Sequence, residues 1–224
     1  MFFYDSTLIL LIPAFIFSVI AQMKVKSTFN KYSRKMSTMG ESGASFARRM
    51  LDSMGLFDVK IENVNGYLSD HYDPTSKILR LSNATYNNKS VAAIGVAAHE
   101  VGHAIQHSKG YKPLALRSAV VPMANFGSNL SWLIFFGGFI FNAPLLLNIG
   151  IILFSFVVAF TLITLPVEFD ASRRALKQLP MLGMPNSEVS MVKSVLTSAA
   201  MTYVAAAAVA ILQLIRMILL SRRD

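Results

Sequence analysis

The 224-residue sequence contains no cysteine, which excludes a disulfide scaffold, a cysteine-ligated zinc site and a cysteine nucleophile. Charge is also scarce: charged residues make up 15% of the chain and hydrophobic residues 54%, a balance typical of membrane proteins. This composition excludes a disordered chain and a collagen-like one. The charge is one-sided, with 21 Lys and Arg against 12 Asp and Glu. Such an excess favours nucleic acid or an anionic membrane surface as partner, and the positions of the charges decide between them.

Four apolar stretches are long enough to cross a bilayer, which requires about 20 residues of helix. They are residues 2–22, 124–141, 144–165 and 197–220. The second and third are joined by a very short connection, which predicts a membrane hairpin. The first could instead be a cleaved signal peptide, but Asp5 stands where a signal peptide carries basic residues. We therefore expect a retained anchor.

The domain organisation follows from these stretches. We expect an anchor at 1–23, a polar segment at 24–123, a transmembrane hairpin at 124–165, a second polar segment at 166–196 and a last transmembrane helix at 197–224. Two crossings separate the polar segments, so both face the same side of the membrane. They hold 18 of the 21 basic residues, and the positive-inside bias makes that side cytoplasmic. The basic excess therefore predicts contact with the lipid bilayer and no nucleic-acid partner, since no basic face is interleaved with aromatic residues.

The first polar segment shows internal order. Residues 41–54 have helical spacing, residues 59–64 alternate as a half-buried strand does, and residues 67–70 and 77–81 predict two short strands. Residues 90–107 predict a helix capped by Ser90.

This last predicted helix contains the pattern H-E-x-x-H, formed by His99, Glu100 and His103. Positions i and i+4 lie on one face of a helix, so both imidazoles can bind one zinc ion. Glu100 lies beside them, where it can take a proton from water activated by the metal. The flanking residues are almost wholly apolar, and buried polar groups require partners, which a metal supplies. The pattern predicts one Zn²⁺ per chain.

A catalytic zinc ion requires a third protein ligand. Lys109 stands where one class of zinc proteases has its third histidine, and His107 lies about 12 Å along the helix axis from His99, too far to share the ion. Glu168 and Asp170 follow directly on the third apolar stretch, on the same side of the membrane as the predicted zinc helix. Pro166 predicts the start of a new helix there. We expect Glu168 to be the third ligand, the alternative being a solvated acid in the first turn of a helix.

Three motifs carry a resemblance to a known family. Residues 68–74 (LSDHYDP), 99–106 (HEVGHAIQ) and 165–172 (LPVEFDAS) resemble the YugP-like family of bacterial membrane zinc metallopeptidases, over nearly the whole chain. More distantly, the chain is similar to HtpX-type membrane proteases, whose second motif is Glu-x-x-Ala-Asp. That comparison implies that Glu168 is the ligand and that Ser172 replaces the Asp that orients a zinc-binding histidine. A serine can accept the imidazole N–H, but as a neutral group, and Asp170 could compensate.

His71 is a further candidate catalytic residue, because we expect it in a polar loop, residues 69–73, between the two short strands that lead into the zinc helix. A histidine opposite the metal often stabilises the oxyanion in zinc peptidases. Alternatively, Asp70 and Asp73-Pro74 form turns and His71 is merely exposed. The preceding strand could instead be an edge that pairs with an extended substrate.

The sequence thus predicts a mainly α, α+β multi-pass membrane protein with a zincin-like catalytic unit. We expect a zinc metalloendopeptidase with His99, His103 and Glu168 as ligands, Glu100 as general base, and peptides or membrane proteins as substrates. Its expected location is the bacterial inner membrane, with the catalytic segment in the cytoplasm. The alternative is a regulatory or scaffold membrane protein that zinc stabilises, which would not need Glu100. A transporter or channel is disfavoured because the apolar stretches contain few charged residues.

Overall fold

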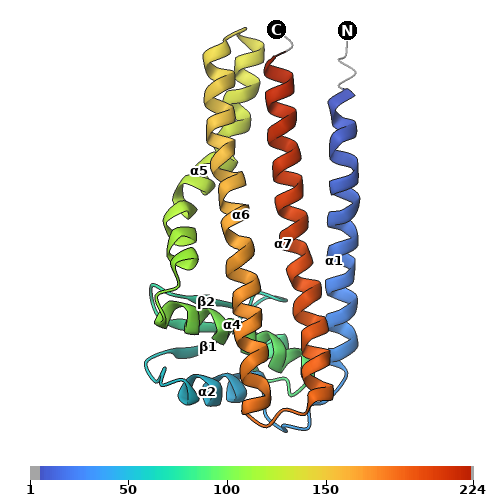
Figure 1. The fold of residues 1–224 in the computed structure, drawn as a ribbon, viewed down its shortest axis with the longest axis vertical. Coiled ribbons are helices and arrows are strands. Elements are labelled where there is room, and N and C mark those ends of the chain that lie inside the picture. Colours follow the sequence, from blue (N-terminus) through green and yellow to red (C-terminus); the bar gives the residue numbers. More distant parts are fainter. Residues whose placement is uncertain (1–5, 223–224) are drawn as a thin grey trace. The chain divides into compact units, whose positions relative to one another are not determined.

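A computed structural model describes residues 6–222 (Figure 1). The N-terminal half contains a 3₁₀ helix at Ser6–Leu11, α1 at Ile12–Ser33, α2 at Gly43–Ser53, β1 at Lys60–Val64, β2 at His71–Asp73, β3 at Ile78–Ser82, α3 at Asn83–Tyr86 and α4 at Val91–Ser108. The C-terminal half consists of α5 at Lys112–Ile140, α6 at Pro144–Met181 and α7 at Asn186–Ser221. The predicted mainly α fold with a small sheet is confirmed.

Within residues 6–222, four helical stretches are long and apolar enough to cross a membrane. They are Thr7–Ser33, Lys112–Ile140, Pro144–Met181 and Asn186–Ser221. Each extends beyond the apolar stretch that predicted it. Residues 2–5 of the expected anchor, with Asp5, and the end of the last expected helix at 223–224 lie outside the described part of the chain.

The prediction that Pro166 starts a new helix is wrong, because α6 runs through it without a break. A proline inside a helix removes one backbone hydrogen bond and costs about 3 kcal/mol. The residues after it offset this cost, since Ala171, Ala175 and Leu179 are fully buried, the last two in a core shared with α4. Tertiary packing therefore maintains the helix where the local signal favours an end.

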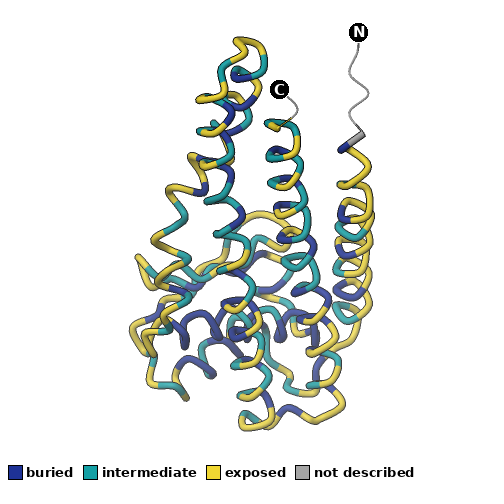
Figure 2. The backbone as a smooth tube through the Cα atoms, turned by 45° about the horizontal axis from the view of Figure 1, so that its top comes forward, coloured by how far each residue is buried: buried dark blue, intermediate teal, exposed yellow. Residues whose placement is uncertain are grey.

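The chain divides into two compact units, which we describe separately. The first combines Ala115–Leu165 with the described parts of Met1–Gln22 and Met201–Asp224. Its core lies between α5, α6 and α7, where Trp132 packs on Phe135 and Phe154. Figure 2 shows the burial along each helix; on α1 the exposed residues gather on one side.

The second unit comprises Met23–Leu114 and Pro166–Ala200 and contains a three-stranded sheet in the order β1-β3-β2. β1 pairs with β3 in parallel, and β2 pairs with β3 antiparallel, with His71 opposite Arg80. The strand predicted at 67–70 is wrong: Leu68 has a φ of 56°, which an extended strand does not allow. The second strand is instead His71–Asp73, at the edge of the sheet, so His71 lies in a strand and not in the expected loop.

Helix α4 forms the centre of the second unit. Ser90 caps it as predicted, since its side chain accepts a hydrogen bond from the backbone N–H of Ala93. Most of its residues are buried, and it contacts α2, α3, β2 and β3. Its alanines and glycines allow this close packing, because small side chains let neighbouring elements approach. A helix that is apolar nearly all round is expected at the centre of a core.

A buried carboxylate at the start of α7 is hydrogen-bonded to the segment that follows α1. Glu188 is 3% exposed and accepts hydrogen bonds from the Ser37 hydroxyl (2.5 Å) and from the Thr38 backbone N–H (2.9 Å). These bonds join residues that are far apart in the sequence.

We expect Glu188→Ala to lower the free energy of unfolding by about 2 kcal/mol, because it leaves two donors without their acceptor. Thermal unfolding of the detergent-solubilised protein measures this loss. The control is Glu62→Ala, which removes a half-exposed carboxylate paired with Arg80 and should change the midpoint little. Equal shifts for both variants would contradict the assignment.

Candidate metal centre

His99 and His103 lie one turn apart on α4 and face the same side. Their ring centroids are 4.8 Å apart and the ring planes are nearly perpendicular, at 84°. The local spacing of H-E-x-x-H produces this arrangement directly, because residues four apart are neighbours on a helix.

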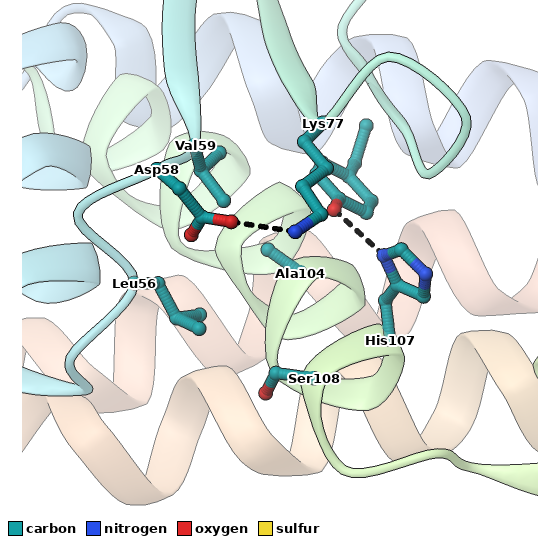
Figure 3. Close-up of a pocket in the computed structure, with 8 residues that line it drawn as sticks. Leu56, Asp58, Val59, Lys77, Ala104, His107 and Ser108 are labelled. Carbon is teal, nitrogen blue, oxygen red and sulfur yellow. Dashed lines mark hydrogen bonds and ion pairs between the residues drawn. The ribbon is translucent and has the colours of Figure 1, made fainter.

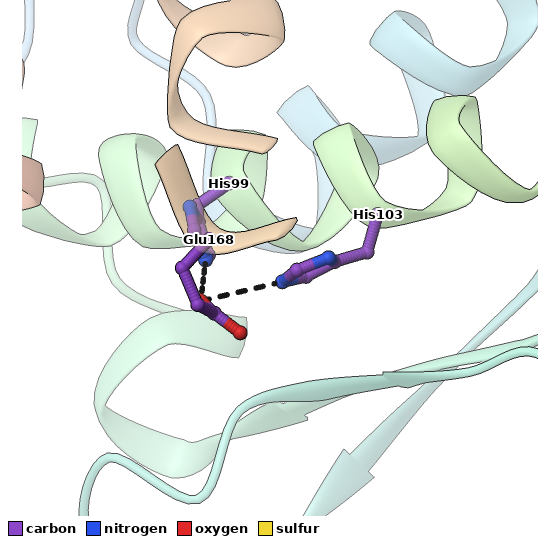
Figure 4. A group of neighbouring side chains, drawn as sticks. All are labelled: His99, His103 and Glu168. Carbon is purple, nitrogen blue, oxygen red and sulfur yellow. Dashed lines mark hydrogen bonds and ion pairs between the residues drawn. The ribbon is translucent and has the colours of Figure 1, made fainter. Parts of the chain in front are cut away.

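Glu168 on α6 meets the two histidines (Figure 4). Its Oε2 atom lies 3.2 Å from His99 Nε2 and 3.6 Å from His103 Nε2. One ligand atom from each residue lies within 4.8 Å of the others. The side chain of Glu168 is buried, so this carboxylate is not the solvated acid of the alternative interpretation.

These separations suit a tetrahedral zinc ion. Zinc bonds of about 2.0–2.2 Å to nitrogen and oxygen place neighbouring ligand atoms about 3.3 Å apart. The two measured distances bracket that value. Two neutral imidazoles and one carboxylate are also a donor set that zinc peptidases use, with one position left open.

The other ring nitrogen of each histidine has a partner of its own. His99 Nδ1 lies 3.0 Å from the Ser172 hydroxyl, which fits the orienting place that the comparison with HtpX-type proteases implies for Ser172. His103 Nδ1 lies 3.0 Å from Gln106 Oε1. Because each Nδ1 atom already has a hydrogen-bonding partner, the Nε2 atom of each ring remains available, and it faces Glu168.

Glu100 lies between the two histidines in the sequence and is 7% exposed. Burial raises the pKa of the Glu100 carboxyl above its ordinary value, and the charges of His99 and His103 oppose this rise. A carboxylate with a raised pKa is suited to accept a proton near neutral pH and to release it again.

The approach of α4 to α6 depends on a glycine beside His103. A Cβ atom at Gly102 would lie 2.4 Å from the backbone oxygen of Ala171 on α6. No other residue type allows this separation, so Gly102 permits α6 to place Glu168 and Ser172 against the histidines.

His71 does not join this group. It is exposed on β2, where its Nδ1 lies 2.9 Å from the Ser69 carbonyl. Since that carbonyl can only accept a hydrogen bond, Nδ1 donates to it, and the Nε2 atom of His71 is available to other partners. Its expected catalytic role stays a prediction.

His107 also lies apart from the three candidate ligands, as its distance along the helix predicts. Its Nδ1 atom lies 2.9 Å from the Tyr72 hydroxyl. Both residues line a pocket together with Leu56, Val59 and Ala104 (Figure 3). Burial, together with the charges of Asp58 and Asp73, raises the pKa of Tyr72 to about 12. The hydroxyl therefore stays protonated at neutral pH. It forms a hydrogen bond with His107 that does not involve the candidate metal ligands.

Gln106, whose side chain is fully buried, also belongs to the site, although its sequence position was not expected to place it there. Its Nε2 atom donates to the Val167 carbonyl (2.8 Å) and to the Asp170 carboxylate (2.9 Å). Asp170 in turn forms ion pairs with Arg173 and Arg174. The missed signal is spacing: Gln106 stands three residues after His103 in an apolar helix, which places it on the same face.

Comparisons with known proteins identify a family of zinc peptidases. Residues 7–222 match the protein family described as "Putative neutral zinc metallopeptidase". The chain is also 50% identical, over 218 residues, to the "Putative membrane protease YugP" of Bacillus subtilis (strain 168). That match covers 96% of this chain and 97% of the relative, while no solved structure matches. The chain therefore belongs to the neutral zinc metallopeptidase family, in its YugP-like group of membrane proteins.

Proposed function

We propose that this protein is a membrane metalloendopeptidase in which His99, His103 and Glu168 bind one Zn²⁺ and Glu100 is the general base. The observation that carries this proposal is the meeting of the three ligand atoms within 4.8 Å, with Glu100 adjacent to His99 on the same helix. The name of the 50% identical relative, a membrane protease, supports the same activity.

Zinc bound by these residues would acidify water in its open position and polarise a peptide carbonyl. Glu100 accepts a proton as the water oxygen bonds to the carbonyl carbon. It then delivers this proton to the leaving nitrogen, so that the C–N bond breaks and a neutral amine departs. Burial raises the pKa of Glu100, which favours its accepting a proton in the first step.

His71 is the second catalytic residue in this proposal: with Nδ1 donating to the Ser69 carbonyl, its imidazolium form would donate to the oxyanion through Nε2. The sheet order supports a substrate near it, because β2 is an edge strand that pairs, within residues 6–222, on one side only. An extended peptide can pair with such an edge.

The proposed location of the catalytic unit is the cytoplasmic face of the bacterial inner membrane. The support is the distribution of charge, since 18 of 21 basic residues fall in the two polar segments 24–123 and 166–196. A site next to the bilayer suits the loops and termini of membrane proteins as substrates.

Removal of the metal tests the proposal. We expect the detergent-purified protein to hold about one zinc ion per chain, and to lose casein cleavage when treated with a chelator and regain it when zinc is restored. Glu168→Ala should lose most of its zinc, because one of the ligands is gone.

Elemental analysis and the casein assay on the same samples give the answer. Glu41→Ala, which removes a partly exposed carboxylate paired with Arg49, is the control and should keep its zinc. If Glu168→Ala retains full zinc, the third ligand is another residue, with Asp170 and His71 the next candidates. If the zinc-loaded protein cleaves no peptide, the regulatory or scaffold function takes the place of the enzyme.

A further inference from the structure

Gln106 connects a candidate zinc ligand to a buried carboxylate on another helix. It is fully buried on α4 and makes three hydrogen bonds: one with His103 and two with Val167 and Asp170 on α6. Each of the three partners constrains how the amide is oriented.

The orientation of the amide follows from the chemistry of its partners. The Val167 carbonyl and the Asp170 carboxylate can only accept hydrogen bonds, so the NH₂ group of Gln106 must face them. The amide oxygen therefore faces His103 Nδ1, which must carry a proton. His103 then presents the lone pair of Nε2, the atom that faces Glu168.

Asp170 strengthens this arrangement. It is 5% exposed, and besides Gln106 it binds Arg173 and Arg174, so its charge is paired. An amide that donates to a carboxylate has a more negative oxygen, and that oxygen accepts more strongly from the imidazole. A stronger acceptor on Nδ1 makes Nε2 a better metal ligand.

The other histidine has a different support. The Ser172 hydroxyl is hydrogen-bonded to His99 Nδ1. Because a hydroxyl can donate as well as accept, this hydrogen bond does not determine the tautomer of His99. The negative charge of Asp170 therefore acts on His103, through Gln106. His99 is instead hydrogen-bonded to the neutral Ser172.

We propose that Gln106 is a positioning residue that holds His103 in its zinc-binding tautomer and orientation, and that Asp170 acts on His103 through it. The proposal rests on the proposed metal site. A purely structural Gln106 would only satisfy buried polar groups between α4 and α6, and its loss would lower stability without a specific effect on the metal.

The test measures zinc affinity, by competition with a chromophoric chelator, and thermal unfolding of the zinc-free protein. We expect Gln106→Met, which keeps the length of the side chain but has no hydrogen-bonding amide, to weaken zinc binding by about 10- to 100-fold. The control is Gln178→Met, which makes the same change on α6, after the residues of the site. It should leave zinc affinity unchanged.

A rescue variant separates positioning from packing. Gln106→Glu combined with Asp170→Asn retains an acceptor for His103 Nδ1 and a donor–acceptor pair between the two positions, with the charge moved next to the histidine. The Val167 carbonyl loses its donor in this variant, so the stability of the zinc-free protein should stay low while zinc affinity recovers. We expect this double variant to bind zinc within a few-fold of the wild type, whereas Gln106→Met does not. The visible spectrum of the cobalt-substituted proteins should differ from wild type for Gln106→Met and return towards it in the double variant.

Each outcome has one meaning. Wild-type zinc affinity in Gln106→Met would overturn the positioning role, while the metal site itself would stand. Equal losses of zinc affinity in the Met variant and the double variant, in proportion to lowered zinc-free stability, would also overturn it, because packing alone would then explain both. If the wild type binds no zinc, the proposed metal site fails and this inference fails with it.

Discussion

Glu100→Gln should lose proteolysis by about 100- to 10,000-fold and keep its zinc. The amide has nearly the same shape as the carboxylate, so α4 can retain its packing, but the amide cannot accept a proton from water. Glu100 does not belong to the group formed by His99, His103 and Glu168, so zinc content should stay near one ion per chain. Casein cleavage and elemental analysis on the same purified samples measure both effects.

This substitution separates an enzyme from a zinc-stabilised membrane protein. A scaffold would need the three ligands but not the base, so Glu100→Gln would leave its function intact. Glu62→Gln, which changes a half-exposed glutamate on β1, is the matched control and should retain full cleavage. Wild-type cleavage by Glu100→Gln in a working assay would refute the assignment of Glu100 as general base.

Gly102→Ala should have the second large effect, although it changes no ligand. The added methyl group would lie 2.4 Å from the Ala171 backbone oxygen, a separation that real Cβ atoms do not adopt. Because the obstacle is helix backbone and not the tip of a flexible side chain, α4 and α6 must move apart. Glu168 and Ser172 lie on the displaced stretch of α6, and His99 and His103 lie on α4.

We expect Gly102→Ala to weaken zinc binding and to lower cleavage by about 100-fold, since a misplacement of about 1 Å has that cost. Overpacking should also lower the free energy of unfolding by about 1–3 kcal/mol.

The control is Gly137→Ala on α5. A Cβ atom there meets no atom within 4 Å, so this variant should be neutral or slightly more stable. Normal zinc affinity and cleavage in Gly102→Ala would show that the helices tolerate separation, and that the close approach is not needed for the site.

Local patterns account for the parts of this protein that could be predicted. The membrane character follows from four long apolar stretches, because the length needed to cross a bilayer is a property of each stretch alone. His99, Glu100 and His103 are equally local, since helix geometry places residues four apart on one face.

Glu168 is a different case, because it lies 69 residues from His99 in the sequence. The residues themselves favoured Glu168 as the third ligand, and the resemblance to membrane proteases implied the same residue. The structure distinguishes the two carboxylates: Glu168 faces the imidazoles, whereas Asp170 faces Gln106 and two arginines.

The sequence by itself determined the membrane helices and the placing of His99, Glu100 and His103 together on one helix, because each depends on spacing within one helix. Only the tertiary structure decided that α6 continues through Pro166, that β2 begins at His71, and that Gln106 supports His103. Each of these depends on a partner far away in the chain: buried packing after Pro166, pairing of β2 with β3, and the acceptors on α6. Such partners are brought together by the folded core, and local propensity contains no information about them.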